Sequence, residues 1–132
     1  MNFEDHIDPF SWHEHDNEAS VTLYASDGYK KDLFKTRKKD GFRGTGYDWE
    51  SLAQAFLNEV MPEIKESIKF DSENGMFCAY SSDLEALKTF AVSFKNACED
   101  DALLHRVFSH AKPDTPPTAQ DINDFLRNFM GK

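Results

Sequence analysis

Two amphipathic helical patterns that flank a hairpin signal constrain the fold of this chain more than any other feature. Apolar residues recur at helical spacing over 52–64 and again over 84–98. Between them, the strand-like runs 68–70 and 76–81 enclose Asn74-Gly75, a dipeptide that favours a tight turn because both residues tolerate positive φ. The order helix, hairpin, helix predicts a sheet with helices packed against it.

A second hairpin is predicted near the N-terminus. Residues 10–15 and 20–25 have the alternation or the composition of strands, and residues 16–18 connect them. Segment 27–39 is compatible with either a short helix or an edge strand. Residues 40–46 contain three of the chain's six glycines, so we expect a loop there.

Acidic residues mark where the predicted helices begin. Asp48 and Asp83 stand where a carboxylate caps the free N–H groups of a first helical turn. Pro62 removes a backbone donor, so the first long helix is expected to kink or end near Met61. A shorter helix is expected over 101–110.

These elements predict an α+β fold, with a small antiparallel or mixed sheet and three to four helices packed on one face. The α+β domain is expected to span residues 1–112. Residues 113–132 hold three of the five prolines and are expected to form a linker and a C-terminal amphipathic helix. That helix would begin at Thr118 or Asp121.

The charge of the chain is unevenly distributed. Twenty-four acidic and 15 basic residues give a net charge of −9, yet segment 30–39 contains six Lys or Arg residues and one Asp. The acids concentrate in segments 1–27 and 40–101, which hold seven and thirteen. An acidic surface repels nucleic acid and anionic membranes and attracts basic partners, so we expect neither nucleic-acid nor membrane binding. Solubility alone is the other explanation of this acidity.

The chain shows no targeting or membrane signal. Residues 1–16 contain no Lys, no Arg and no apolar run, and no stretch approaches the roughly 18 apolar residues of a membrane span. Cys78 and Cys98 are expected to be free thiols in a reducing compartment, with a disulfide between them as the alternative. The cytoplasm is therefore the expected location.

No motif predicts catalytic or metal-binding chemistry. His13 and His15 share a face if they lie on a strand, but zinc needs three or four converging ligands. The acidic turn 71–75 is too short for a calcium-binding loop. The chain has no nucleophile elbow and no phosphate-binding glycine loop with a lysine. We therefore expect no enzyme activity, no cofactor and no metal.

Three motifs occur in a distinctive order. They are Gly-Tyr-Asp-Trp at 46–49, the acid-bearing hairpin 70–75, and Met-Phe-Cys-Ala-Tyr at 76–80. In this arrangement the chain resembles the immunity protein 51 family of bacterial polymorphic toxin systems, over about residues 21–108. The resemblance implies a small α+β protein, encoded beside a secreted toxin, that protects the cell by binding the toxin domain stoichiometrically in the cytoplasm. It carries over no catalytic residues.

The first hypothesis is therefore an antitoxin that binds a toxin domain, for example a basic nuclease. Acidic groups would accelerate association by electrostatic steering. The candidate toxin-binding residues are Tyr47, Trp49, Asp71, Glu73, Glu99, Asp100 and Asp101. Packing around the helix start is the alternative role of Tyr47 and Trp49. We expect the protein to be a monomer or a weak homodimer.

The second hypothesis, from a different class, is a regulatory module that binds a small anion or ligand. The glycine loop 41–46 precedes a helix, and helix N-termini attract anions. The basic segment 30–39 would add positive charge. Against this hypothesis, Asp48 stands at the helix start and would repel a phosphate, and the basic segment is otherwise a solvated surface.

Overall fold

The computed structural model describes residues 3–113, and within them four strands form one antiparallel sheet in the order β1-β2-β4-β3. The strands are β1 (Ser11–His15), β2 (Glu18–Tyr24), β3 (Lys69–Phe70) and β4 (Met76–Ser81). The two predicted hairpins join through β2 and β4, whose register pairs Thr22 with Cys78. The predicted C-terminal helix lies outside the described residues.

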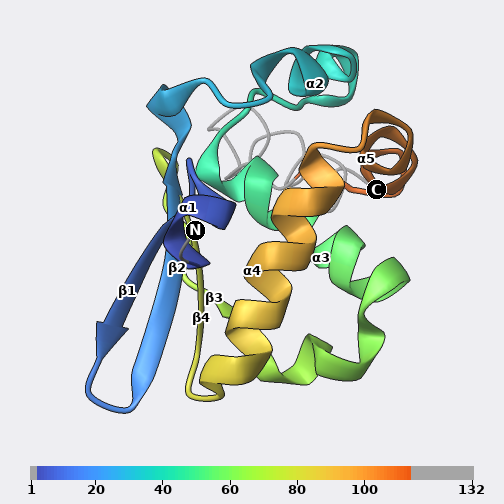
Figure 1. The fold of residues 1–132 in the computed structure, drawn as a ribbon. Coiled ribbons are helices and arrows are strands. Elements are labelled where there is room, and N and C mark those ends of the chain that lie inside the picture. The colour runs from blue at the N-terminus through green and yellow to red at the C-terminus, as the bar shows by residue number, and fades with distance from the viewer. Residues whose placement is uncertain (1–2, 114–132) are drawn as a thin grey trace, which may run out of the picture.

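Helices cover one face of this sheet (Figure 1). The two long helices, α3 (Gly46–Val60) and α4 (Leu84–Cys98), pack against β4 and β2. The short helices are α1 (Phe3–Ile7), α2 (Lys31–Lys35) and α5 (Asp101–Phe108), and the 3-10 helices are η1 (Ala25–Asp27), η2 (Lys38–Asp40) and η3 (Pro62–Ser67). The α+β fold is confirmed. The described part has more short helices than predicted, because five residues are too few to show a helical period.

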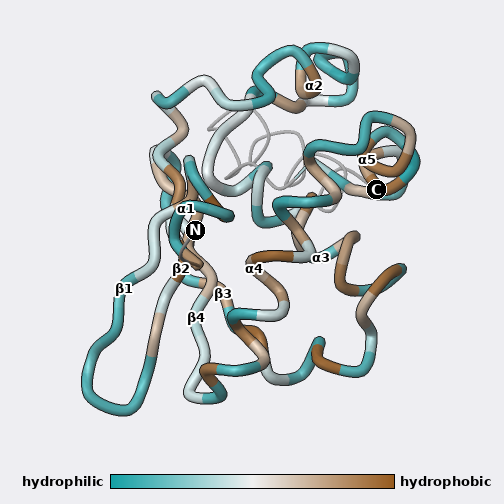
Figure 2. The backbone as a smooth tube through the Cα atoms, viewed as in Figure 1, coloured by the Kyte–Doolittle hydropathy of each residue, from teal (hydrophilic) through white to brown (hydrophobic). Residues whose placement is uncertain are grey.

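The sheet has one buried face and one partly exposed face. Val21, Phe77 and Ala79 point toward the helices and are at most 1% exposed. Because side chains alternate along a strand, Cys78 and Tyr80 point the other way and are only half-buried. Figure 2 shows hydrophilic residues along β1 and its turn into β2, the edge of the sheet farthest from α3.

Aromatic rings fill the space between the sheet and the helices. Trp49 of α3 is only 2% exposed and lies among the rings of Phe10, Phe34, Phe77 and Phe94, with centroid separations from 5.2 to 6.5 Å. Edge-to-face and tilted contacts of this kind are the favoured geometry for aromatic pairs. Trp49 is therefore a core residue.

The start of α3 differs from the prediction in one detail. Thr45, not Asp48, is the N-cap: the Thr45 hydroxyl accepts a hydrogen bond from the Asp48 N–H at 3.1 Å, and the Asp48 carboxylate accepts one from the Thr45 N–H at 3.3 Å. This capping box places its acid at the third helical position. Asp83 does cap α4, accepting from the Ala86 N–H at 3.0 Å, as predicted.

The predicted end of the first long helix and the predicted hairpin turn are both confirmed in position. α3 ends at Val60, just before Pro62. The turn residues Asn74-Gly75 are closed by two backbone hydrogen bonds between Glu73 and Met76, at 2.7 and 3.1 Å. Neither turn residue has a positive φ, so the predicted reason for the turn is wrong.

Candidate functional site

The face of the sheet turned away from the helices carries a strip of half-buried and exposed side chains. Its apolar part is formed by Met76, Cys78 and Tyr80 of β4 and Tyr24 at the end of β2, and Tyr24 is 65% exposed. We call these four residues the open strip. Tyrosine and methionine are enriched in the cores of protein interfaces, so this strip is the first candidate for a contact surface.

Two carboxylates lie beside the open strip on its β3 side, where the exposed Lys69, opposite Tyr80, lies on the same face. The β3–β4 register opposes Asp71 to Cys78 and Glu73 to Met76, which brings both acids to the same face as the strip. Burial raises the pKa of the Cys78 thiol, and Asp71, Glu50, Glu18 and Glu73 raise it further in that order. Negative charges near a thiol disfavour its thiolate form, so the electrostatic potential at Cys78 is negative.

The structure thus brings together two of the residues predicted from sequence, Asp71 and Glu73, and adds Glu18, which sequence reasoning missed. Glu18 belongs to the same face as Tyr24 because the two are separated by an even number of residues in β2. That alternation was the available signal. Glu50 lies on α3, which packs on the other face of the sheet, so it influences the Cys78 thiol without belonging to the open strip.

Trp49 does not belong to this surface. Its ring is buried and also stacks on Tyr29, with centroids 5.9 Å apart and planes at 7°. Aromatic rings surround the Trp49 side chain, which favours the alternative role of packing in the core. Tyr47, two residues earlier in α3, is half-buried and remains a candidate.

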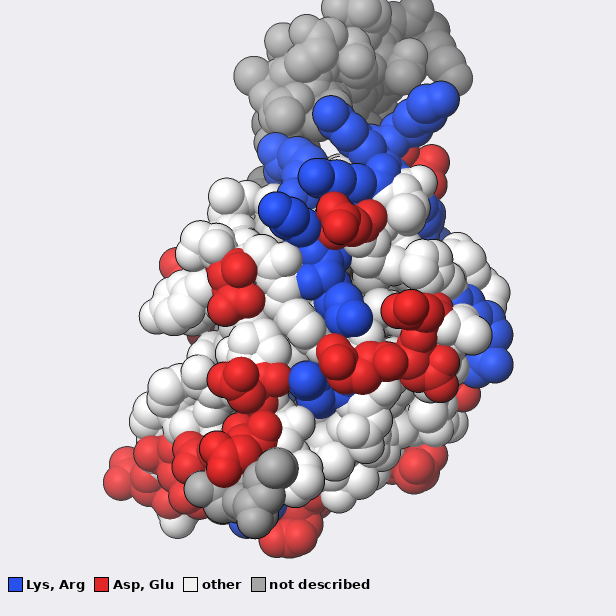
Figure 3. All heavy atoms as spheres, turned by 45° about the horizontal axis from the view of Figure 1, so that its top comes forward, with Lys and Arg blue, Asp and Glu red and all other residues white. Residues whose placement is uncertain are grey.

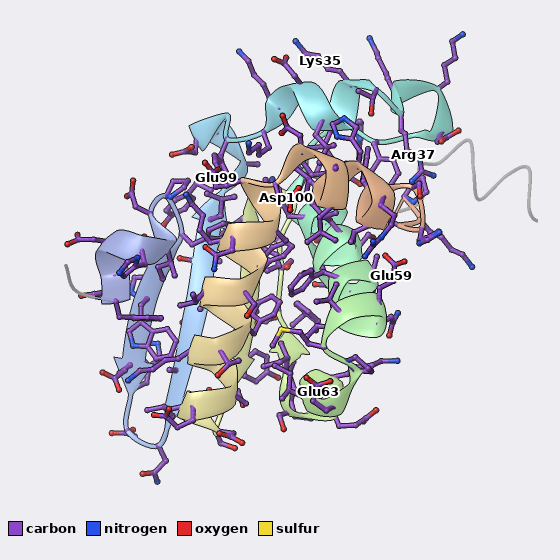
Figure 4. All side chains as sticks on the ribbon, turned by 45° about the vertical axis from the view of Figure 1, so that its right-hand side comes forward. Lys35, Arg37, Glu59, Glu63, Glu99 and Asp100 are labelled. Carbon is purple, nitrogen blue, oxygen red and sulfur yellow. The ribbon has the colours of Figure 1, made fainter. Side chains whose placement is uncertain are left out.

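Glu99 and Asp100 lie at the junction of α4 and α5, facing α2, and form a separate group (Figure 4). The Glu99 carboxylate accepts a hydrogen bond from the Tyr29 hydroxyl and lies 3.6 Å from Lys30 Nζ and 3.7 Å from Lys95 Nζ. Asp100 is the N-cap of α5 and accepts from the Leu103 N–H at 3.2 Å. Both acids have structural roles within the chain.

These contacts distinguish the junction from the acids on the sheet. Asp101, the third predicted acid of this group, is also exposed, and its backbone carbonyl lies 2.9 Å from His105 Nδ1. Sequence reasoning missed the pairing of Glu99 because Tyr29 is 70 residues away along the chain.

A basic cavity lies at the same end of the molecule as α2. Its volume is about 320 Å³, and it lies between the segment that contains α2 and the glycine loop before α3. The described lining residues are Ala25, Gly28, Tyr29, Lys31, Phe34, Lys35, Lys38, Phe42, Arg43, Gly44 and Trp49. Figure 3 shows Lys and Arg side chains gathered in a band over this end, with Asp and Glu on either side.

Arg37 holds the segment that carries this cavity onto the rest of the fold. Its guanidinium donates to the backbone carbonyls of Phe108 and Ala111 at 2.5 and 2.7 Å and to the Asp40 carboxylate at 2.7 Å. It also lies over the rings of Phe42 and Phe108, 4.7 and 5.1 Å from their centroids. The side chain runs toward the end of α5 in Figure 4.

The His and Cys side chains of the described residues do not form a metal-binding cluster. Among residues 3–113, no three His, Cys, Asp or Glu side chains converge as metal ligands. His13 is exposed on β1 and its Nε2 lies 3.2 Å from the Thr22 hydroxyl. Cys78 and Cys98 are free thiols, as predicted. No helix in the described part of the chain has the length and apolarity to cross a membrane.

Comparison with known proteins bears on the identity of the fold. The family model described as Immunity protein 51 matches residues 10–113. The match includes the whole sheet, both long helices, the open strip and the basic cavity. Comparison with curated proteins gave no significant match, and comparison with solved structures gave none. Because the family model covers most of the sequence, the chain belongs to the immunity protein 51 family.

Proposed function

We propose that this protein neutralises a cognate bacterial toxin domain in the cytoplasm by stoichiometric protein–protein contact. Membership of the immunity protein 51 family supports a toxin as the partner. The two free thiols are in keeping with a reducing compartment. The proposed mechanism is occlusion of the toxin, with no chemical step carried out by this chain.

The observation that carries the proposal is the open strip with the carboxylates beside it. Tyr24 and Tyr80 offer flat amphipathic rings, and Met76 offers an adaptable apolar side chain. Asp71 and Glu73 are exposed beside them. An apolar centre with a charged rim is the usual anatomy of a protein interface. We infer that the toxin binds here.

The charge of this surface indicates the kind of toxin. Negative groups attract a basic partner over about a Debye length, roughly 8–10 Å at physiological salt, and so increase the association rate. A basic nuclease is such a partner, since its substrate-binding groove is cationic. The carboxylates would then take the place of the phosphates that the nuclease grips. A net charge of −9 argues against direct nucleic-acid binding by this chain itself.

Co-expression with the toxin encoded beside this protein tests the proposal. The wild-type protein should restore growth and co-purify with the toxin domain in a one-to-one complex. The free protein is expected to sediment as a monomer or a weak dimer. If cells that express both die as readily as cells that express the toxin alone, the proposed function is wrong.

A charge-reversal pair locates the interface. Asp71→Lys with Glu73→Lys should lower the association rate constant about 10- to 100-fold, most strongly at low salt. The matched control is Glu63→Lys with Glu66→Lys on η3, which changes the net charge equally at two exposed positions away from the strip. Equal losses in both pairs would show that only the net charge matters and that the toxin binds elsewhere.

A further inference from the structure

The basic cavity stands out because of its charge. Its described lining includes Lys31, Lys35, Lys38 and Arg43, and none of the described lining residues is Asp or Glu. This occurs in a chain whose 24 acids outnumber its 15 bases. Lys35 has an ion pair with Asp32 at 3.6 Å, but both side chains are well exposed, at 68% and 86%, so the pair does little to neutralise the lysine.

The inner wall of the cavity is aromatic. Phe34, Phe42 and Trp49 line it and are nearly buried, and Tyr29 is half-buried. A volume of about 320 Å³ is at the small end of ligand pockets and suits a molecule with one ring system and one charged group. The cavity therefore combines an apolar wall with a cationic rim.

The backbone N–H groups of the glycine loop are not free to bind an anion in this cavity. The N–H groups of Arg43, Gly44 and Thr45 all donate to Asp48 Oδ2, at 2.6, 2.9 and 3.3 Å. Asp48 thus occupies the position that a phosphate takes in a phosphate-binding loop. It also holds Arg43 and Gly44 in the cavity wall, so the lysine and arginine side chains are the groups left to hold an anion.

We propose that this cavity binds a small aromatic phosphate, such as a nucleoside monophosphate, with the ring against the aromatic wall and the phosphate at the rim formed by Lys35, Lys38 and Arg43. The aromatic wall would bind the ring and the cationic rim would bind the phosphate. Because neither part of the cavity encloses its group fully, both contacts are needed for binding. The cavity shares no residue with the open strip, so this proposal stands or falls independently of toxin binding.

Calorimetry on the full chain tests the proposal with AMP and phenyl phosphate as probes, and with adenosine and inorganic phosphate as their separate halves. Both aromatic phosphates should bind saturably and at least tenfold more tightly than either half. Lys35→Gln with Lys38→Gln should weaken AMP binding at least tenfold. The control pair, Lys65→Gln with Lys112→Gln, removes the same charge at exposed positions outside the lining and should leave binding unchanged.

A fluorescence measurement confirms the place of binding. Trp12→Phe leaves Trp49 as the only tryptophan of the chain, and AMP should change its emission with the same dissociation constant. The proposal is overturned if neither aromatic phosphate binds saturably, if both lysine pairs lose affinity equally, or if AMP leaves Trp49 emission unchanged.

Discussion

The Tyr29 hydroxyl donates a hydrogen bond to the carboxylate of Glu99, which joins the segment before α2 to the end of α4. Lys30 and Lys95 flank the same carboxylate, and both ammonium groups also lie 5.5 Å from the centroid of the Tyr29 ring. Tyr29 forms part of the cavity wall, so this small network fixes one side of the cavity. It also makes stability depend on pH.

Glu99→Gln should lower stability at neutral pH and have a diminishing effect as the solution becomes acidic. The Tyr29 hydrogen bond is the main cause that lowers the pKa of Glu99 from 4.5, and Lys95 and Lys30 lower it further. A carboxyl whose folded pKa lies below its unfolded pKa stabilises the fold above the unfolded value, and the contribution is lost as pH falls through the folded value. Urea unfolding of both proteins from about pH 7 down to pH 3 measures the difference.

Tyr29→Phe is the companion variant for the same contact. It should cost about 1 kcal/mol at neutral pH, the net value of one hydrogen bond. Burial, followed by the Glu99 hydrogen bond, raises the pKa of Tyr29 above 10.0. A raised folded pKa stabilises the fold fully below the unfolded value, so the cost should shrink as pH rises above about 10. A cost that is constant across that range would contradict the raised pKa of Tyr29 in the folded protein.

Arg37→Ala should destabilise the protein by about 2 kcal/mol, because hydrogen bonds from a charged group and stacking on aromatic rings are lost together. Arg37→Lys keeps the charge but cannot reach two carbonyls and Asp40 at once, so it should recover less than half of the loss. Lys39→Ala, at an exposed neighbouring position, is the control and should be nearly neutral. Thermal unfolding of the three variants decides between them.

Gly46→Ala should destabilise the fold by about 3 kcal/mol, the upper range for an added methyl in a closed space. A Cβ at Gly46 would lie 2.1 Å from the carbonyl oxygen of Glu73 and 2.4 Å from that of Met76. The hairpin turn approaches this closely because the Gly46 N–H donates to the Asn74 carbonyl at 2.8 Å. The turn would have to move away from α3, which denaturant unfolding detects.

Gly75→Ala is the matched control in the same turn. A Cβ there meets no atom within 4 Å, and Gly75 does not have a positive φ. Alanine should therefore be neutral or stabilise by about 0.5 kcal/mol through the unfolded chain. A loss as large as that of Gly46→Ala would show that the turn depends on glycine itself.

The thiol of Cys78 reports the potential of the open strip. Because burial and the neighbouring carboxylates raise its pKa, iodoacetamide should modify it slowly near neutral pH. Asp71→Asn with Glu73→Gln should lower that pKa and accelerate the reaction. Cys98 is fully buried, with its pKa raised to about 12, and should stay unmodified in the folded protein. A bound toxin should protect Cys78, and an unchanged rate would place the toxin on another surface.

The secondary structure was predicted well where the controlling interactions are local. The ends of α3 and α4, the position of the 74–75 turn and the two hairpins follow from caps, Pro62 and alternation, which act over a few residues. The predicted N-cap of α3, Asp48, lies only three positions from the observed N-cap, Thr45, and both belong to one capping box. Segment 27–39 stayed ambiguous because Leu33 and Phe34 form α2 only by packing into the aromatic core.

The sequence by itself determined the fold class, the free thiols, the acidity and the presence of Asp71 and Glu73 on one hairpin. Only the tertiary structure decided that Trp49 is core, that Glu99 is bound by Tyr29, and that the basic segment and the glycine loop enclose one cavity. The physical reason is contact range. Caps and alternation join residues a few positions apart, whereas burial and ion pairing depend on segments brought together from distant parts of the chain.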